Sequence, residues 1–229
     1  MNICFLGMSH LGIVSSIAAA SKGINVFCFD EDKDKIKNLK NEKFEVDEPD
    51  LIKTYNQFKS NITFFSEFKN IDLIIDVYIV SQDIKTSENG VSDLTQVKKL
   101  LKIVKKLSLP SSAVVILSQV PPKFTRAYRN KFTHLYYQVE TLIFGNAVKR
   151  AIYPERIIVG VDQKEKKITH KKFNQYLKLF GCQIVIMNYE SAELAKLSIN
   201  LFLISSITFG NLMNNMSSRI GADWSDILF

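Results

Sequence analysis

Cysteine and histidine are scarce in this chain, with three of each among 229 residues. Cys4, Cys28 and Cys182 stand far apart inside apolar runs, without the spacing of a metal site. We therefore expect free, buried thiols in a protein of a reducing compartment. The sequence also shows no metal-binding cluster and no Ser-His-Asp set, so we predict neither a metal centre nor a serine hydrolase.

Long uninterrupted apolar runs are also missing. The longest candidate, Leu194 to Leu212, is broken by a lysine, serines and asparagines, so we expect no membrane span. The net charge is +7, but the lysines are spread over predicted helix faces. Because no arginine cluster is interleaved with aromatic residues, we expect no nucleic acid partner. The chain starts with an apolar run and shows no signal peptide, which favours a cytoplasmic location.

The first thirty residues carry the pattern of a dinucleotide-binding unit. We expect a buried strand at residues 2–6, a helix at 13–22, and a second strand at 24–29 that ends at Asp30. The glycine-rich turn Gly7-Met8-Ser9-His10-Leu11-Gly12 lies between the first strand and the helix. This order is typical of sites that bind an adenosine diphosphate.

Each residue of this pattern has a physical role. Gly7 lets the chain turn sharply, and Gly12 lets the helix lie close to the sheet. The amides at the helix start favour the negative charge of a diphosphate. Asp30 can accept hydrogen bonds from ribose hydroxyls and would repel a 2′-phosphate. Ser9 stands where the pattern has a second glycine, which predicts weaker binding, and His10 is interpreted as loop surface.

Apolar runs alternate with helix-like stretches along the rest of the chain. This predicts an α/β fold, a Rossmann-type doubly wound, mostly parallel sheet with helices on both faces, followed by a long C-terminal helix. Strands are expected at 61–65, 71–80, 113–117, 134–139, 156–161 and 183–187, and helices at 32–39, 48–58, 93–107, 121–131, 171–180 and 191–218. We assign residues 1–188 to the dinucleotide-binding domain and 189–229 to the start of a second, dimerisation or substrate domain.

Apolar residues cover most of the circumference of the last predicted helix. Such a helix must be buried on several sides, so we expect a homodimer formed through residues 189–217, or cover by a second domain. The chain ends on Asp226-Ile227-Leu228-Phe229, whose apolar side chains have nothing after them to pack beneath. We therefore expect that the protein continues beyond residue 229.

Lys196 and Asn200 stand four residues apart in this helix and share one face. A buried lysine is unfavourable unless it has a partner or a task, and burial lowers an ammonium pKa, which suits proton transfer at a substrate hydroxyl. In the alternative interpretation, Lys196 reaches the surface and pairs with Glu190 or Glu193. The spacing alone favours neither.

Two further segments follow strands at the edge where open α/β sheets bind ligands. Glu140 follows the strand at 134–139; its alternative role is that of an ordinary acidic residue at a helix start. Ser118 and Gln119 follow the strand at 113–117 and could line the same crevice, or form only a strand-to-helix turn.

Taken together, these segments resemble the UDP-glucose/GDP-mannose 6-dehydrogenase family over nearly the whole chain. The order of the proline-flanked strand and the Lys-x-x-x-Asn helix is fairly specific. The matching segments are Phe5 to Gly12, Asp30 with Asp32, Glu48-Pro49-Asp50-Leu51, Ser92-Asp93-Leu94, Ser118-Gln119-Val120-Pro121-Pro122, Val139-Glu140 through Val148, Tyr153 to Gly160, and Glu193 to Asn200.

The resemblance implies NAD as cofactor and a nucleotide sugar as substrate, whose C6 alcohol is oxidised to a carboxylate in two hydride transfers. It implies a catalytic role for Glu140 in proton transfer and thioester hydrolysis. Lys196 and Asn200 match the pair that polarises the reacting oxygen. The resemblance also implies that Gly7, Gly12 and Asp30 hold NAD. We predict as further cofactor-binding residues Ser9, His10, Leu11, Ser81, Ser118 and Gln119.

The chain departs from the family pattern at several positions. The family cysteine that carries the covalent intermediate lies beyond residue 229, so we expect these residues alone not to complete the reaction. Ser9 replaces a glycine, Gln119 a threonine, Val139 a proline and Phe144 a second glutamate, and Val80-Ser81 stands where Thr-Pro is expected.

Three functional hypotheses follow. The first is a nucleotide-sugar 6-dehydrogenase that supplies uronic acids for envelope polysaccharide. The second is a β-hydroxyacid-type dehydrogenase without a covalent intermediate. The third is a member that keeps the fold and the dimer but has lost its chemistry. A cysteine in a glycine-rich segment after residue 229 would favour the first over the second, and turnover of a nucleotide sugar would reject the third.

Overall fold

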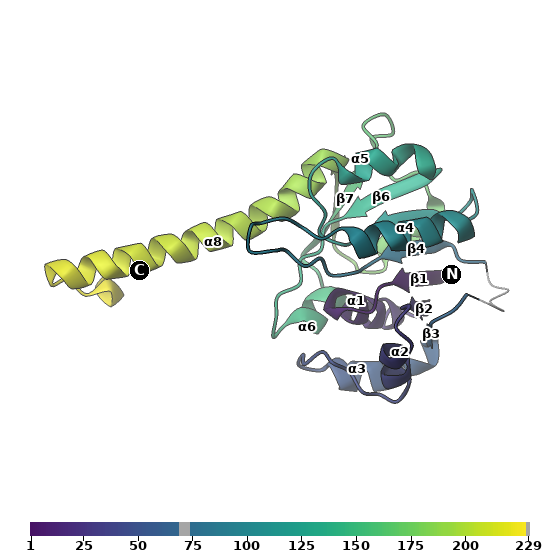
Figure 1. Ribbon diagram of the computed structural model, residues 1–229, viewed down its shortest axis with the longest axis horizontal. Coiled ribbons are helices and arrows are strands. Elements are labelled where there is room, and N and C mark those ends of the chain that lie inside the picture. The colour runs from purple at the N-terminus through teal and green to yellow at the C-terminus, as the bar shows by residue number, and fades with distance from the viewer. Residues whose placement is uncertain (69–73, 228–229) are drawn as a thin grey trace.

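Eight strands form one sheet in the order β3-β2-β1-β4-β5-β6-β7-β8. The computed structural model (Figure 1) describes residues 1–68 and 74–227. The strands are β1 (Asn2–Leu6), β2 (Asn25–Phe29), β3 (Ile62–Phe65), β4 (Val77–Val80), β5 (Ala113–Ile116), β6 (His134–Gln138), β7 (Arg156–Val161) and β8 (Gln183–Asn188).

The sheet is parallel except at one junction. Strands β1 to β6 pair in parallel, as do β7 and β8, whereas β6 and β7 run antiparallel. The connection between β6 and β7 therefore stays at the carboxyl end of β6, and β7 returns in the opposite direction. The predicted mostly parallel sheet is confirmed.

Helices cover both faces of the sheet because alternate strand residues point to opposite sides. Ile3 and Phe5 of β1 pack in the core beneath α1, α2, α3, α6 and α7, whereas Cys4 and Leu6 pack beneath α4, α5 and the start of α8. The helices are α1 (His10–Ala20), α2 (Lys33–Lys40), α3 (Leu51–Phe58), α4 (Thr95–Leu107), α5 (Phe124–Tyr128), α6 (Ala147–Ile152), α7 (Lys171–Lys178) and α8 (Tyr189–Ile220).

Some element boundaries differ from the predicted ones. The strand expected at 71–80 begins at Val77, and its residues 71–73 lie outside the described residues. The helix expected from Pro121 begins at Phe124, because Lys123 has a left-handed backbone with φ 75° that turns the chain first. The six-residue helix α6 was not predicted.

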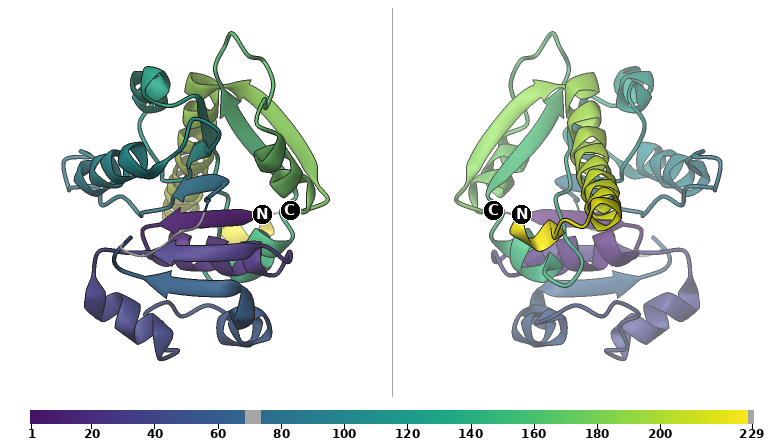
Figure 2. Two further views of the ribbon diagram at one scale, coloured as in Figure 1. Left: turned by 90° about the vertical axis from the view of Figure 1, so that its right-hand side faces the viewer. Right: turned by 90° about the vertical axis from the view of Figure 1, so that its left-hand side faces the viewer.

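Helix α8 is a rod of 32 residues that projects away from the sheet (Figure 1), and Figure 2 views it nearly end-on. The Asn188 side chain caps its start by accepting a hydrogen bond from the Ser191 amide at 2.7 Å. Its end is at Gly221, where φ is 76°. Only its first turns pack against β6, β7, β8 and α5, and most of its apolar side chains are exposed.

The expectation that no segment reaches the length of a membrane span needs correction for α8. The helix is long and apolar enough to cross a membrane by length and composition alone. The polar residues inside it do not lower its average hydropathy enough to exclude a span. Core helices of soluble proteins can have the same length and composition, so these two properties of α8 are only weak evidence for a membrane span.

Candidate active site

The sheet changes its winding direction between β1 and β4. The strand order proceeds from β1 through β2 to β3 on one side, and from β4 outward on the other. Ligands of open α/β sheets bind outside the carboxyl ends of the strands at such a point. In this chain these ends lead into the glycine turn after Leu6 and into the loop after Val80.

The glycine turn admits no side chain at either end. Gly7 has φ 95°, and a Cβ there would lie 2.9 Å from the Cβ of Gln82. A Cβ on Gly12 would lie only 1.9 Å from the carbonyl oxygen of Gly7. The first turn of α1 therefore packs directly on the glycine turn, as the sequence pattern predicts.

Asp30 lies beside this turn at the end of β2. One carboxylate oxygen accepts the Met8 amide at 2.8 Å and faces the Lys35 ammonium at 3.4 Å. The other oxygen accepts the Asp32 amide at 3.0 Å. The carboxylate is thus held beside the glycine turn, with one oxygen accepting two hydrogen bonds from the protein and the other accepting one.

The loop after β4 lies against the start of α1. The Ser9 hydroxyl donates to the Ser81 carbonyl at 3.2 Å and accepts the Asp83 amide at 2.8 Å. The Asp83 carboxylate accepts the Leu11 amide at 3.3 Å. Sequence analysis missed Asp83, although an acid three residues after a strand at the switch point was a usable signal.

Two predicted cofactor contacts are buried supports of the turn. The Ser81 hydroxyl is fully buried and donates to the Gly7 carbonyl at 3.1 Å and the Leu6 carbonyl at 3.3 Å. The Ser118 hydroxyl, also fully buried, donates to the Val80 carbonyl at 3.4 Å. We therefore revise their role from direct contact to positioning of the neighbouring backbone.

His10 contacts a buried acid, rather than lying free on the loop surface. Its Nε2 lies 2.9 Å from a Glu48 carboxylate whose side chain is fully buried. Glu48 also accepts the amides of Gly145 at 3.1 Å and Ala147 at 3.0 Å. Burial acts to raise the pKa of Glu48, but the bonds from Ala147, His10 and Gly145 outweigh it and lower the pKa. Glu48 therefore ties the glycine turn to the segment that follows Glu140.

Lys196 and Glu140 form a mostly buried ion pair. The ammonium lies 2.9 Å from a Glu140 oxygen, and the side chains are 8% and 16% exposed, respectively. The other Glu140 oxygen accepts the Leu142 amide. The family resemblance implied that both groups act at one site, and the structure brings them into direct contact.

The alternative partners of Lys196 are engaged elsewhere. Glu190 pairs with the Arg126 guanidinium at 2.8 Å. Glu193 is buried and accepts the amides of Lys123 at 2.7 Å and Thr125 at 2.8 Å. The alternative in which Lys196 pairs with either acid at the surface is wrong.

Asn200 extends this cluster by one helical turn. Its amide nitrogen donates to the Gln119 side-chain oxygen at 3.2 Å. Helix α8 thus places Lys196 beside the carboxyl end of β6 and Asn200 beside the carboxyl end of β5. Four of the predicted residues, on three separate elements, come together here.

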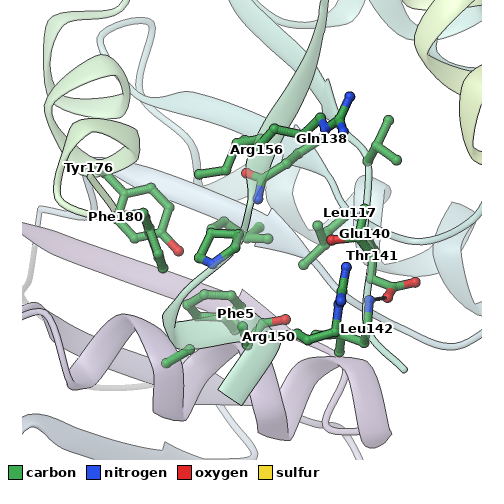
Figure 3. Close-up of a pocket in the computed structure, with 17 residues that line it drawn as sticks. Phe5, Leu117, Gln138, Glu140, Thr141, Leu142, Arg150, Arg156, Tyr176 and Phe180 are labelled. Atoms are coloured by element: carbon green, nitrogen blue, oxygen red, sulfur yellow. Dashed lines mark hydrogen bonds between the residues drawn. The ribbon is translucent and has the colours of Figure 1, made fainter. Parts of the chain in front are cut away.

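A small cavity of about 60 Å³ is lined in part by Glu140 (Figure 3). Its lining includes Gln138, Leu142 and Arg150, and the Gln138 side-chain oxygen is buried without a hydrogen-bond partner among the described residues. This volume holds a few water molecules at most, whereas ligand pockets are on the order of 300–1,000 Å³. The cavity is not a substrate site.

The three thiols are unsuited to nucleophilic chemistry. Cys4 and Cys28 are fully buried and Cys182 is half-buried. Burial raises all three pKa values, that of Cys28 to about 12, so the thiols stay protonated near neutral pH. Within residues 1–68 and 74–227, no group of three or more His, Cys, Asp or Glu side chains is arranged to hold a metal ion.

Comparison with known sequences identifies relatives of this chain. Residues 1–178 match the NAD-binding domain of the UDP-glucose/GDP-mannose dehydrogenase family. A UDP-glucose 6-dehydrogenase of Rickettsia bellii is 30% identical over 97% of this chain and 53% of the relative. UDP-glucose 6-dehydrogenase TuaD of Bacillus subtilis is 28% identical over 98% of this chain and 50% of the relative. The chain spans about half the length of the curated relatives it matches.

Solved structures show the same fold. A GDP-mannose dehydrogenase of Pseudomonas aeruginosa superposes with a TM-score of 0.85 at 20% identity, over 100% of this chain and 56% of that chain. A UDP-glucose dehydrogenase of Pyrobaculum islandicum gives a TM-score of 0.85 at 21% identity, over 99% of this chain and 55% of that chain. At these identities the likeness concerns the architecture alone.

Proposed function

Because the chain belongs to the UDP-glucose/GDP-mannose dehydrogenase family, we propose that it supplies the cofactor-binding and proton-transfer part of an NAD-dependent nucleotide-sugar 6-dehydrogenase. The reaction proposed is oxidation of a sugar C6 alcohol to a uronic acid. The observation that carries the proposal is the contact of 2.9 Å between the buried Lys196 ammonium and Glu140. A buried amine and carboxylate at the carboxyl edge of a Rossmann-type sheet suit proton transfer.

The residues at the switch point fit an NAD molecule. Gly7 and Gly12 leave no room for side chains, so a diphosphate would meet the backbone at the start of α1, where Asp83 now accepts the Leu11 amide. Asp30 follows β2 beside the glycine turn, which suits recognition of ribose hydroxyls, and its charge would disfavour a 2′-phosphate. NAD held by these residues would supply the acceptor for the hydride that leaves the sugar carbon.

The proposed roles of the chain's own catalytic residues follow from their charges. The Lys196 ammonium stabilises negative charge that develops on the substrate oxygen. Glu140 holds the amine in place and accepts or returns protons, directly or through water. Asn200, whose amide nitrogen now donates to Gln119, can donate to the same substrate oxygen.

The described residues do not supply the covalent catalyst. The resemblance implies a thiolate nucleophile, and the pKa values of Cys4, Cys28 and Cys182 are all raised by burial. We therefore propose that oxidation to the acid needs a cysteine outside these 229 residues. We further propose a nucleotide-sugar substrate, a cytoplasmic location, a domain division at residues 188 and 189, and a homodimer through α8.

The test is reduction of NAD by the protein in the form in which its cell makes it. UDP-glucose, GDP-mannose and UDP-N-acetylmannosamine are offered in turn, and Lys196→Met and Glu140→Gln are measured beside the unaltered protein. We expect one of these sugars to be turned over and both variants to lose at least about a hundredfold in kcat. Equal turnover by the Lys196→Met variant would refute the proposed role.

A second candidate is a member that binds NAD without turning over a sugar. Two observations favour it: Phe144, which replaces a family glutamate, is 82% exposed, and Asp83 lies on the amide of Leu11. NAD binding with no turnover of any nucleotide sugar would select this candidate. Turnover of one sugar would reject it.

A further inference from the structure

We infer that Asp83 is an intramolecular competitor of the cofactor diphosphate and that the Ser9 hydroxyl holds it in place. This inference rests on the proposed binding of NAD to the glycine turn. It assigns a regulatory contact to two residues that look like mere departures from a nucleotide-binding pattern. In this account the loop after β4 has a closed position on the turn and an open position that admits the cofactor.

The Asp83 carboxylate lies at the start of helix α1. It is 3.3 Å from the Leu11 amide, in the first turn of α1. A free amide at a helix start is a preferred site for an anion, because the peptide dipoles align there. Asp83 therefore satisfies an amide that a diphosphate would otherwise use, and its negative charge repels the ligand.

The loop after β4 is attached to the glycine turn through the Ser9 side chain. The Ser9 hydroxyl accepts the Asp83 amide at 2.8 Å and donates to the Ser81 carbonyl at 3.2 Å. A glycine at position 9 could make neither bond. The serine that departs from the glycine pattern is thus the residue that fixes the competing acid.

The loop after β4 also occupies the space next to the glycine turn. The Cβ and side-chain oxygen of Gln82 both lie 2.9 Å from the point where a Cβ on Gly7 would stand. The loop therefore lies directly over the part of the turn that a dinucleotide must approach. Asp83 itself is exposed, whereas the neighbouring Ile84 packs against the core, so the proposed opening moves Gln82 and Asp83 and leaves Ile84 in place.

The closed position of the loop lowers the apparent affinity for NAD, because only molecules with an open loop bind it. When only a fraction of molecules is open, the apparent Kd rises by the inverse of that fraction. A charge at a helix N-terminus shifts such an equilibrium by roughly two- to fivefold, and its repulsion of the diphosphate adds to this. Removing the charge or the hydroxyl should therefore tighten binding.

The experiment titrates NAD into the 229-residue chain and into Asp83→Asn, Asp83→Ala and Ser9→Gly. Glu88→Gln is the matched control, because it removes an exposed acid from the same loop. The Leu11 amide is followed by NMR in ligand-free protein as an independent readout. Adenosine is titrated as a probe that lacks the diphosphate.

We expect the Asp83 and Ser9 variants to bind NAD at least about threefold more tightly than the unaltered chain, with Glu88→Gln unchanged. Adenosine affinity should not differ, and the Leu11 amide should shift and exchange faster in Asp83→Ala. Equal or weaker NAD binding by the variants overturns the inference while leaving NAD binding intact. Absence of NAD binding in every variant refutes the proposed cofactor site, and the competitor with it.

Discussion

The contacts of some residues in this chain could be predicted from the sequence, and those of others could not. The family resemblance implied a common site for Lys196 and Glu140, which the spacing alone did not decide, and the two side chains touch. Ser9 was identified only as a departure from the glycine pattern, because a sequence does not show what a hydroxyl will bind. Asp83 and the buried Glu48 acquire their roles only from loops that fold back over the turn.

At this scale the Glu140–Lys196 pair makes a prediction about stability. Glu140→Gln leaves a mostly buried ammonium without its counter-charge, so we expect the free energy of unfolding to fall by roughly 1–3 kcal/mol. Glu155→Gln is the control, since its pair with Arg150 at 3.5 Å is largely exposed; it should change stability by less than about 0.5 kcal/mol. Urea unfolding of both variants decides this, and equal losses would contradict it.

Glu48 makes a prediction about pH. Its folded pKa is lowered, so its carboxylate contributes stability above the ordinary value near 4.5 and loses it as the pH falls through the folded value. Glu48→Gln should therefore lower the free energy of unfolding at pH 7 by roughly 1–3 kcal/mol. Its difference from the unaltered chain should shrink in acid. Glu45→Gln, an exposed neighbour, should show neither effect; a difference that is independent of pH would refute the assignment.

At the scale of elements, periodicity predicted the long segments well. The strands β1, β2 and β5 and the helices α4 and α8 lie within a few residues of their predicted ranges, because apolar repeats define them. Helix α6 was missed because six residues are too few for a repeat, and its start depends on the distant Glu48. The antiparallel direction of β7 relative to β6 was also not predictable, because it depends on the path of the connection between the two strands.

The junction of the glycine turn and α1 is the most constrained element contact. Gly12→Ala would place a Cβ 1.9 Å from a backbone oxygen of Gly7, so we expect a loss of at least about 2 kcal/mol in stability. Gly210→Ala is the control, because that glycine lies in α8 with no atom within 4 Å of its Cβ position. The control should raise helix stability by about 0.5–1 kcal/mol. Thermal unfolding followed by circular dichroism would contradict this if the two variants behaved alike.

At the scale of the whole molecule, helix α8 projects from the sheet with most of its apolar side chains exposed. Phe202 is 76% exposed and Phe209 is 62% exposed, with leucines and isoleucines between them. Such a surface is typical of a protein interface. The sequence predicted this apolar circumference and its cover by another subunit or a second domain; within the described residues these side chains are exposed.

We expect the 229-residue chain to self-associate through this helix. Phe202→Asp combined with Phe209→Asp should shift the protein toward monomer in analytical ultracentrifugation, because each charge would have to be buried in the interface. Ile52→Asp on α3, which is 56% exposed outside the helix, is the control and should leave the association unchanged. A monomeric unaltered chain at high concentration would contradict the proposed dimer.

We propose that the glycine turn and Asp30 hold a nicotinamide dinucleotide beside the Lys196–Glu140 pair. Calorimetric titration of the 229-residue chain and its Asp83→Asn variant with NAD and with NADP measures this binding. We expect heat of binding with NAD, stronger binding in the variant, and at least about tenfold weaker binding of NADP, whose 2′-phosphate Asp30 would repel. No heat from either protein at millimolar NAD, or equal affinity for both cofactors, would contradict it.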